Sequence, residues 1–190
     1  MNTETENNTL VITAIGADKP GLVERLTARI GESGCNIDES SMAALGGQCA
    51  LILRVRGPWH ALSKLEGQLP ALGQQLELTL HHERTGKRKP TDAAIPYTVE
   101  LVSPDRPGVV HNLAAFFARN GINIEELQTS TYPAQHTETP TLSVVMTVAI
   151  PASMQIANLR GDFWITATTS TSMRRSSRCG DKLRVWPGSR

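Results

Sequence analysis

An aspartate stands two residues before a Pro-Gly pair twice in the chain, at Asp18 and at Asp105. In both places a short apolar run precedes the aspartate and a run with helical spacing follows, so each loop joins a strand to the start of a helix. The first N–H groups of a helix have no partner within it and carry the positive end of its dipole, so they attract a carboxylate. The aspartate can take an ammonium group, and the loop can therefore address both charged ends of a free amino acid.

The residues near each aspartate suit a loop that a ligand approaches closely. Glycine permits close approach because it has no side chain, and proline fixes the backbone without using a donor. An asparagine after each helix can present its amide to a ligand or bond to its own turn. These positions are Pro20, Gly21 and Asn36 in the first copy and Pro107, Gly108 and Asn123 in the second. A structural role is the alternative, because aspartate is a common N-cap and proline a common residue of the first helical turn.

The two loops belong to an internal repeat. Residues 18–39 align with residues 105–126 at an offset of 87, and ten of the 22 positions are identical, while Lys19 and Arg106 keep the charge. Identity in this order does not arise by chance, so the chain contains two copies of one module.

Each copy predicts a strand before the loop and a helix after it. Short runs rich in β-branched residues at 9–15 and 97–103 are typical of strands. The helices are predicted to bury one apolar face and to end at Gly34 and Gly121, where glycine can adopt the left-handed C-terminal cap. The predicted buried positions are Leu22, Val23, Leu26 and Ile30 in the first copy and Val109, Val110, Leu113 and Phe117 in the second.

The later segments complete a βαββαβ order. Further strands are predicted at 37–45, 48–56, 124–131 and 141–150, and Gly46-Gly47 predicts a tight hairpin. In the first copy a second helix begins at Pro58, and a strand at 77–82 follows it. The side of this helix predicted to be buried consists of Trp59, Leu62, Leu65 and Leu69. The order predicts an α+β fold of two ferredoxin-like modules in tandem, each with an antiparallel sheet and its helices on one face.

The expected organisation has five parts. They are a disordered N-terminus at 1–8, a first domain at 9–84, a linker at 85–94, an incomplete second domain at 95–163 and an aberrant, disordered tail at 164–190. After Phe163 the apolar period is lost, and a reading frame that starts at the last base of the Phe163 codon continues the helix with Leu-Asp. We therefore hypothesise a frameshift near residue 163, which resequencing of the locus tests. A genuine tail is expected to leave the second sheet without a fourth strand and with an open edge.

Composition and charge exclude several functions. Nineteen basic and 18 acidic residues give a net charge of +1, which disfavours direct binding to nucleic acid. The opening MNTETENNT does not read as a signal peptide, and no run approaches the roughly 18 apolar residues of a membrane helix. We therefore expect a cytoplasmic protein with no membrane partner.

The cysteines and histidines predict neither a metal site nor catalysis. Cys35, Cys49 and Cys179 lack ligand spacing, so we expect no disulfide and no zinc, with the first two cysteines in the core. The five histidines occur outside any known catalytic motif, so we expect no enzymatic turnover and no cofactor. They are His60, His81, His82, His111 and His136.

The repeated DxPG loop, the helix, the GxNI turn and the βαββαβ order resemble the ACT domain family of regulatory modules, over residues 9–84 and 95–163. A bare tandem pair of this length resembles more narrowly the glycine cleavage system transcriptional repressor family. That resemblance implies a non-enzymatic repressor of glycine cleavage genes that acts through a DNA-binding activator of the LysR type. It also implies a response to a small amino acid such as glycine.

The resemblance further implies that modules pair side by side, as in a homodimer, with ligand sites at their interfaces. The implied ligand contacts are Asp18, Pro20, Gly21, Leu22, Asn36 and Ile37 in the first module and Asp105, Pro107, Gly108, Val109, Asn123 and Ile124 in the second.

Two other functions remain open from the sequence. The chain can be an ACT-type regulatory subunit of an enzyme of amino-acid metabolism, or a module that kept its fold and lost its ligand. Identification of the bound partner separates the first alternative from a repressor, and titration with amino acids tests the second.

Overall fold

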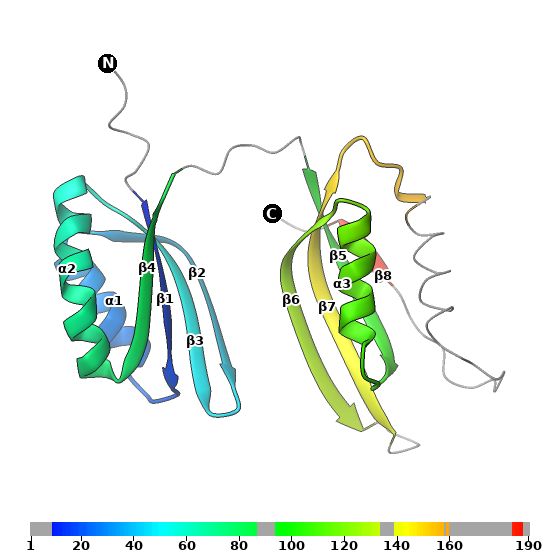
Figure 1. The fold of residues 1–190 in the computed structure, drawn as a ribbon, viewed down its shortest axis with the longest axis horizontal. Helices are drawn as coiled ribbons and strands as arrows, with labels where there is room; N and C mark the ends of the chain where they lie inside the picture. The colour runs from blue at the N-terminus through cyan, green and yellow to red at the C-terminus, as the bar shows by residue number, and fades with distance from the viewer. Residues whose placement is uncertain (1–8, 87–93, 134–138, 158, 160–183, 188–190) are drawn as a thin grey trace. The chain divides into compact units, whose positions relative to one another are not determined.

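The computed structural model describes residues 9–86, 94–133, 139–157, 159 and 184–187. The chain divides into two compact units, 1–89 and 90–190 (Figure 1). The predicted N-terminus at 1–8, most of the linker and most of the tail lie outside the described residues.

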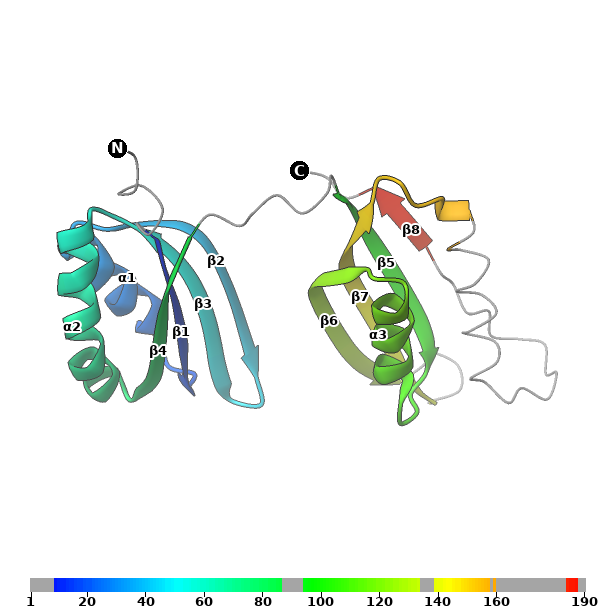
Figure 2. The ribbon, with the colours of Figure 1, turned by 45° about the horizontal axis from the view of Figure 1, so that its top comes forward.

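The first unit is one antiparallel sheet with two helices on one face (Figures 1 and 2). Its elements are β1 (Thr9–Ala17), α1 (Leu22–Glu32), β2 (Asn36–Leu45), β3 (Gln48–Arg56), α2 (Trp59–Leu76) and β4 (Leu78–Thr85). The strands lie in the order β2-β3-β1-β4. Strand β2 is therefore an edge strand, and all but two of its residues are exposed.

The core of the first unit lies between this sheet and its helices. Along β3, buried and exposed residues alternate strictly, because successive side chains of a strand point to opposite faces. The buried side chains of β3 are Cys49, Leu51, Leu53 and Val55. The last three pack with Leu10 and Ile12 of β1 and with the leucines of both helices. Burial of such aliphatic side chains contributes about 1.5 to 3 kcal/mol each.

The second unit repeats the arrangement with one helix defined in full. Its elements are β5 (Ala94–Pro104), α3 (Val109–Arg119), β6 (Asn123–Pro133), β7 (Pro140–Pro151) and β8 (Arg184–Pro187). The strands lie in the order β6-β7-β5-β8. A further helix begins at 156 and is described as far as Leu159, which is buried in this core. Together the two units confirm the predicted α+β fold of tandem βαββαβ modules.

One prediction about the second sheet is wrong. Residues 184–187 pair with β5 in antiparallel register, from Tyr97 opposite Pro187 to Glu100 opposite Arg184. The second sheet therefore has a fourth strand, taken from the tail that was expected to be disordered. Backbone N–H and C=O groups make these ladder bonds whatever the side chains, so a short edge strand can form without a recognisable pattern.

Glycine supplies the backbone turns that the sequence predicts. Gly34 and Gly121 follow the two loop helices with φ of +81° and +65°, in the left-handed region. Gly46 and Gly47 have φ of +59° and +78°, as a two-residue type I′ hairpin requires. The two predicted helix ends and the predicted hairpin are confirmed.

Two residues predicted to be buried lie at the surface. Val23, in the first turn of α1, is 39% exposed and lines an open pocket. Trp59 is 66% exposed, and its ring lies 5.5 Å from the guanidinium carbon of Arg84, a cation–π contact. Cys35 and Cys49 are buried as predicted, and burial raises the pKa of the Cys35 thiol. Within the described residues no helix is long and apolar enough to cross a membrane.

Candidate functional site

The Pro-Gly pair of each loop forms the centre of a type II turn. From Lys19 to Leu22, the N–H of Leu22 donates to the Lys19 carbonyl at 3.4 Å, and Gly21 has φ +86° and ψ −3°. A type II turn places proline at its second position and needs a positive φ at its third. A side chain at Gly21 would meet nothing within 4 Å, so the backbone conformation, not crowding, is what demands glycine.

The second loop repeats this geometry. Gly108 has φ +91° and ψ −8°, and the N–H of Val109 donates to the Arg106 carbonyl at 3.5 Å. In both loops the glycine is the N-cap residue, and no side chain caps the helix. Asp18 and Asp105 therefore do not act as N-caps of these helices.

The start of α1 offers unpaired backbone donors. The first helical bond runs from the N–H of Arg25 to the Gly21 carbonyl at 3.0 Å. In the described part of the chain the N–H groups of Val23 and Glu24 have no acceptor, as expected for a first turn without a side-chain cap. These donors and the positive end of the helix dipole favour an anionic group.

An open pocket of about 380 Å³ lies at this loop. It is lined by Asp18, Lys19, Pro20, Gly21, Leu22, Val23, Glu24 and Met42. The carboxylate of Asp18 is exposed and makes no hydrogen bond or ion pair to another described residue. One pocket thus brings together four of the six residues predicted in the first module, with a free carboxylate beside free N–H groups.

Two contacts hold the loop in place. The N–H of Asp18 donates to the carbonyl of Gly47 at 3.0 Å, which ties the loop to the β2–β3 hairpin. The Nζ of Lys19 donates to Glu77 Oε2 at 2.5 Å, which ties it to the turn between α2 and β4. The hydrogen bond from Lys19 lowers the pKa of Glu77. The Asp18 carboxylate is therefore presented by a loop fixed on both sides.

Asn36 and Ile37 lie at the opposite end of strand β2. Asn36 pairs with Arg56, and its amide donates to the Ile37 carbonyl at 3.4 Å and to Asp38 Oδ1 at 3.3 Å. Ile37 packs against the core. Six residues of strand separate Asn36 from Met42, a distance of about 20 Å. Within one module these two predicted residues do not reach the loop pocket.

The second module places its predicted residues in the same way. The N–H of Asp105 donates to the Pro140 carbonyl at 2.8 Å, while Pro107 and Gly108 are exposed in the turn. Val109, the first residue of α3, is partly buried against the core, and Asn123 and Ile124 begin β6 at its distant end. One difference is that Asp105 Oδ2 accepts a hydrogen bond from Thr131 Oγ1 at 3.5 Å.

Four residues that the sequence did not assign to the site also line the first pocket: Lys19, Val23, Glu24 and Met42. The charge shared by Lys19 and Arg106 was the available signal for Lys19. Met42 enters through strand register, because it lies opposite Leu51 and therefore on the helix side of the sheet. The sequence of a single strand does not reveal with which residues it pairs. Among the described residues, no group of three or more His, Cys, Asp or Glu could hold a metal ion.

The fold and the loops define a tandem ACT-domain protein. Models of the ACT domain match residues 8–83 and residues 97–149. The glycine cleavage system transcriptional repressor of Escherichia coli (strain K12) is 34% identical over 154 residues, which are 81% of each chain. The chain belongs to the glycine cleavage system transcriptional repressor family. This membership gives it a regulatory role.

Solved structures share the fold over nearly the whole chain. A crystal structure assigned as a glycine cleavage system transcriptional repressor has a TM-score of 0.67 at 24% identity and covers 95% of this chain and 98% of its own. A protein of unknown function from Galdieria sulphuraria has a TM-score of 0.74 at 22% identity and covers 97% of this chain and 100% of its own. At these identities the likeness establishes the architecture alone.

Proposed function

We propose that the chain is a non-enzymatic, cytoplasmic regulator that binds a small amino acid such as glycine and represses glycine cleavage genes. It acts through a DNA-binding activator of the LysR type and does not itself bind nucleic acid. The observation that carries the proposal is the pocket at the first loop, where the free Asp18 carboxylate lies beside the unpaired N–H groups of Val23 and Glu24. These groups complement the ammonium and the carboxylate of an amino acid.

Pairing of two chains would complete the site. Strands β2 and β6 are edge strands whose outer backbone groups have no strand partner within their sheets, and such edges favour pairing with another strand. Antiparallel pairing of two β2 strands sets the start of one beside the end of the other. Asn36 and Ile37 of one chain would then lie near the Met42 end of the second chain. A homodimer built in this way uses all six residues predicted for the first module.

Calorimetry with the full chain tests the ligand. Glycine is expected to bind, and Asp18→Asn is expected to weaken binding by roughly 10- to 100-fold, because a hydrogen bond to a charged group contributes roughly 1.5 to 3 kcal/mol. Asp105→Asn is the matched control in the second loop, and it tests whether that loop binds as well. Absence of heat with glycine, alanine and serine would remove the sensor function.

Co-purification tests the partner. Recovery of a LysR-type activator with the chain supports the proposed repressor, and addition of glycine is expected to change the amount recovered. Recovery of an enzyme of amino-acid metabolism, with no activator, would contradict it. The near-neutral charge of +1 agrees with an indirect action on DNA.

A further inference from the structure

Two exposed apolar side chains lie in the loop pocket beside its polar groups. Val23 of α1 is 39% exposed and Met42 of β2 is 48% exposed, and both line the pocket. They come from different elements, yet they line the same open space as Asp18. In addition to its carboxylate and its N–H groups, the loop pocket therefore has an apolar wall, formed by Val23 and Met42.

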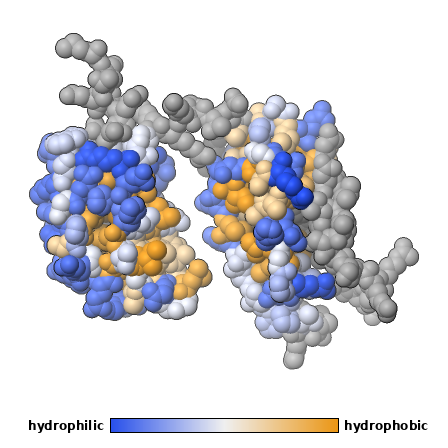
Figure 3. All heavy atoms as spheres, in the orientation of Figure 1, coloured by the Kyte–Doolittle hydropathy of each residue, from blue (hydrophilic) through white to orange (hydrophobic). Residues whose placement is uncertain are grey.

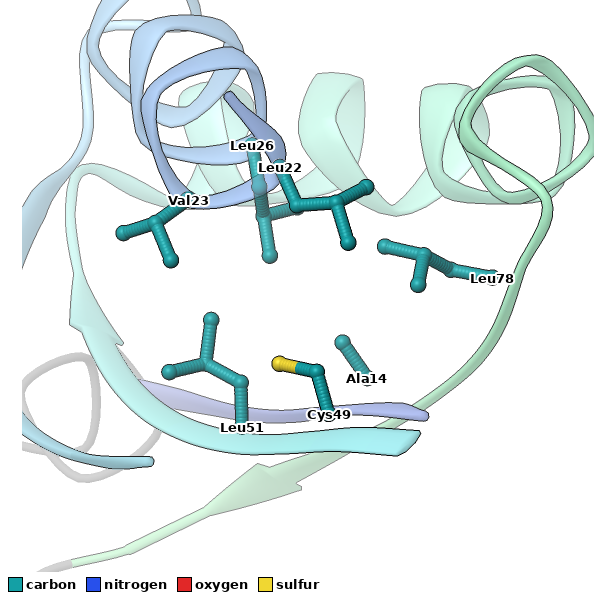
Figure 4. Close-up of a pocket in the computed structure, with 7 residues that line it drawn as sticks. All are labelled: Ala14, Leu22, Val23, Leu26, Cys49, Leu51 and Leu78. Atoms are coloured by element: carbon teal, nitrogen blue, oxygen red, sulfur yellow. The ribbon is translucent and has the colours of Figure 1, made fainter. Parts of the chain in front are cut away.

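Strand register and helix packing bring both side chains of the apolar wall next to Leu51. Met42 lies opposite Leu51 in the β2–β3 ladder, so these two residues are cross-strand neighbours on the helix side of the sheet. In Figure 4 Val23 extends from α1 toward the sheet, and Leu51 extends from β3 toward Val23. Leu51 itself is buried. The apolar wall is therefore supported from behind by the core and is exposed on the pocket side.

The second module has a polar residue at the position of Met42. The repeat offset of 87 relates Met42 to Thr129. Thr129 lies opposite Val144 in the β6–β7 ladder, as Met42 lies opposite Leu51 in the β2–β3 ladder. A hydroxyl group and one methyl group thus replace the longer thioether side chain. The residue of the second module offers a substitution that makes this position polar.

The volume of the loop pocket exceeds what glycine needs. Its volume of about 380 Å³ lies within the range of small-molecule sites, roughly 300 to 1,000 Å³. Glycine has no side chain, so with its charged ends at Asp18 and at the first N–H groups it would leave the apolar wall in contact with water. An aliphatic side chain would cover the wall and would itself leave water, which favours binding.

We infer that Val23 and Met42 receive the side chain of the bound amino acid, so that the site prefers small aliphatic amino acids such as alanine and valine to glycine. The inference rests on the proposed function, because the ammonium and carboxylate of the ligand must be held at the loop. The pocket is open, so the side chain reaches the apolar wall without passing through the core. Threonine has nearly the shape of valine but is disfavoured, because its hydroxyl would lie against apolar groups.

A calorimetric series with glycine, alanine, valine and threonine on the full chain tests this preference. The apolar wall covers a side chain from one side, so we expect about twofold tighter binding for each carbon added from glycine to alanine and valine, half the free-energy gain of full burial. Threonine is expected to bind roughly two- to tenfold more weakly than valine.

Two variants test whether the preference comes from the apolar wall. Met42→Thr introduces the residue of the second module and is expected to lower the ratio of valine affinity to glycine affinity about twofold or more. Ile52→Thr is the matched control, because Ile52 is 53% exposed and lies next to Leu51 along β3, on the other face of the sheet. This control removes an exposed apolar side chain away from the pocket and is expected to leave the ratio unchanged.

The outcomes separate the inference from the proposed function. Glycine binding that depends on Asp18, with equal affinities for glycine and valine, would overturn the inference alone. A ratio unchanged by Met42→Thr would also overturn it, and a dimer weakened by this variant in analytical ultracentrifugation would then show that Met42 serves a contact between chains. Absence of binding by all four amino acids would overturn both. The comparison of valine with threonine on the wild-type chain decides the matter if circular dichroism shows that Met42→Thr does not fold.

Discussion

At the scale of single residues, the site depends on a backbone conformation that few residues adopt. Gly21 has φ +86° in the type II turn, and the residues of the first turn of α1 that follow it line the pocket. The Asp18 carboxylate stays free because the glycine, and not the aspartate, occupies the N-cap position. Two properties of one loop, its conformation and its unpaired charge, therefore make it suitable for a zwitterion.

Replacement of two glycines by alanine should have opposite effects. Gly21→Ala places a side chain at positive φ and is expected to lower the free energy of unfolding by about 1 to 2 kcal/mol. Gly31→Ala, the matched control, lies inside α1 where nothing within 4 Å meets a new methyl group, and it is expected to raise stability by roughly 0.5 to 1 kcal/mol. Urea unfolding measures both, and equal effects of the two substitutions would contradict the role of the turn.

The residues of the first loop could be predicted because their types and order repeat. The sequence could not decide whether Asp18 caps the helix or stays free, since both use the same residue at the same place. It also could not supply Met42, which lines the loop pocket through the register between β2 and β3. Pairing between distant segments decides which face such residues occupy.

At the scale of elements, α2 is fastened to the edge strand β4 by one polar cluster. Arg84 donates from Nε to Glu66 Oε1 at 2.8 Å and from Nη2 to Glu66 Oε2 at 2.7 Å and to Ser63 Oγ at 2.8 Å. The paired fork geometry is the strong form of an ion pair. Both side chains are largely buried, at 22% and 23% exposed, and the hydrogen bonds from Arg84 lower the pKa of Glu66.

The lowered pKa of Glu66 predicts a pH dependence of stability. A carboxyl group with a depressed pKa in the folded state contributes fully above its unfolded pKa, near 4.5, and loses that contribution as the pH falls through the folded value. Glu66→Gln is therefore expected to cost about 1 kcal/mol at pH 7, and the difference from wild type should shrink as the pH falls below about 4.5.

A surface ion pair provides the control for this prediction. Arg29 and Glu32 pair at 3.0 Å on α1, where both side chains are well exposed. Glu32→Gln is expected to change stability by less than about 0.5 kcal/mol at either pH. Thermal unfolding of both variants at pH 7 and pH 3.5 makes the comparison. If the loss of stability caused by Glu66→Gln became larger at pH 3.5 than at pH 7, the predicted role of the Glu66 carboxylate would be contradicted.

Most elements were predictable from periodicity, and the errors have physical causes. The pattern placed Trp59 on the buried side of α2, but it stands at the first residue of the helix, where the ring can turn outward to lie under Arg84. Val23 fits the apolar spacing of α1 but lines the open loop pocket, so it remains exposed. Helical spacing identifies the face of a helix but not how completely each of its residues is covered.

At the scale of the whole molecule, the two modules share a fold and differ in their interiors. Each module has its own core. At the strand positions where the first module has Ala14 and Cys49, the second module has Leu101 and Leu142. In the first unit hydrophobic residues are visible over the strands in Figure 3, and its most exposed apolar residues of β1, β2 and β3 are Ile15, Met42, Leu45 and Ile52. The two copies of the repeat therefore have one fold but different core residues.

The repeat made the tandem architecture predictable, but the strand near the end of the chain could not be predicted. Strand β8 has no counterpart to the alternating strand of the first module, and its four residues follow a segment without any period. Its place beside β5 comes from backbone pairing, which side-chain patterns do not record. The hypothesis of a frameshift near residue 163 stays a prediction for the gene sequence.

The central claim is that the first loop of the chain binds an amino acid through its backbone and through Asp18. Titration of the ¹⁵N-labelled chain with glycine, followed by amide resonances in NMR spectra, tests it most directly. The amides of Val23 and Glu24 are expected to shift together and saturably in the wild type, and far less in Asp18→Asn. Shifts confined to residues away from 18–24, or no shift at any glycine concentration, would contradict the claim.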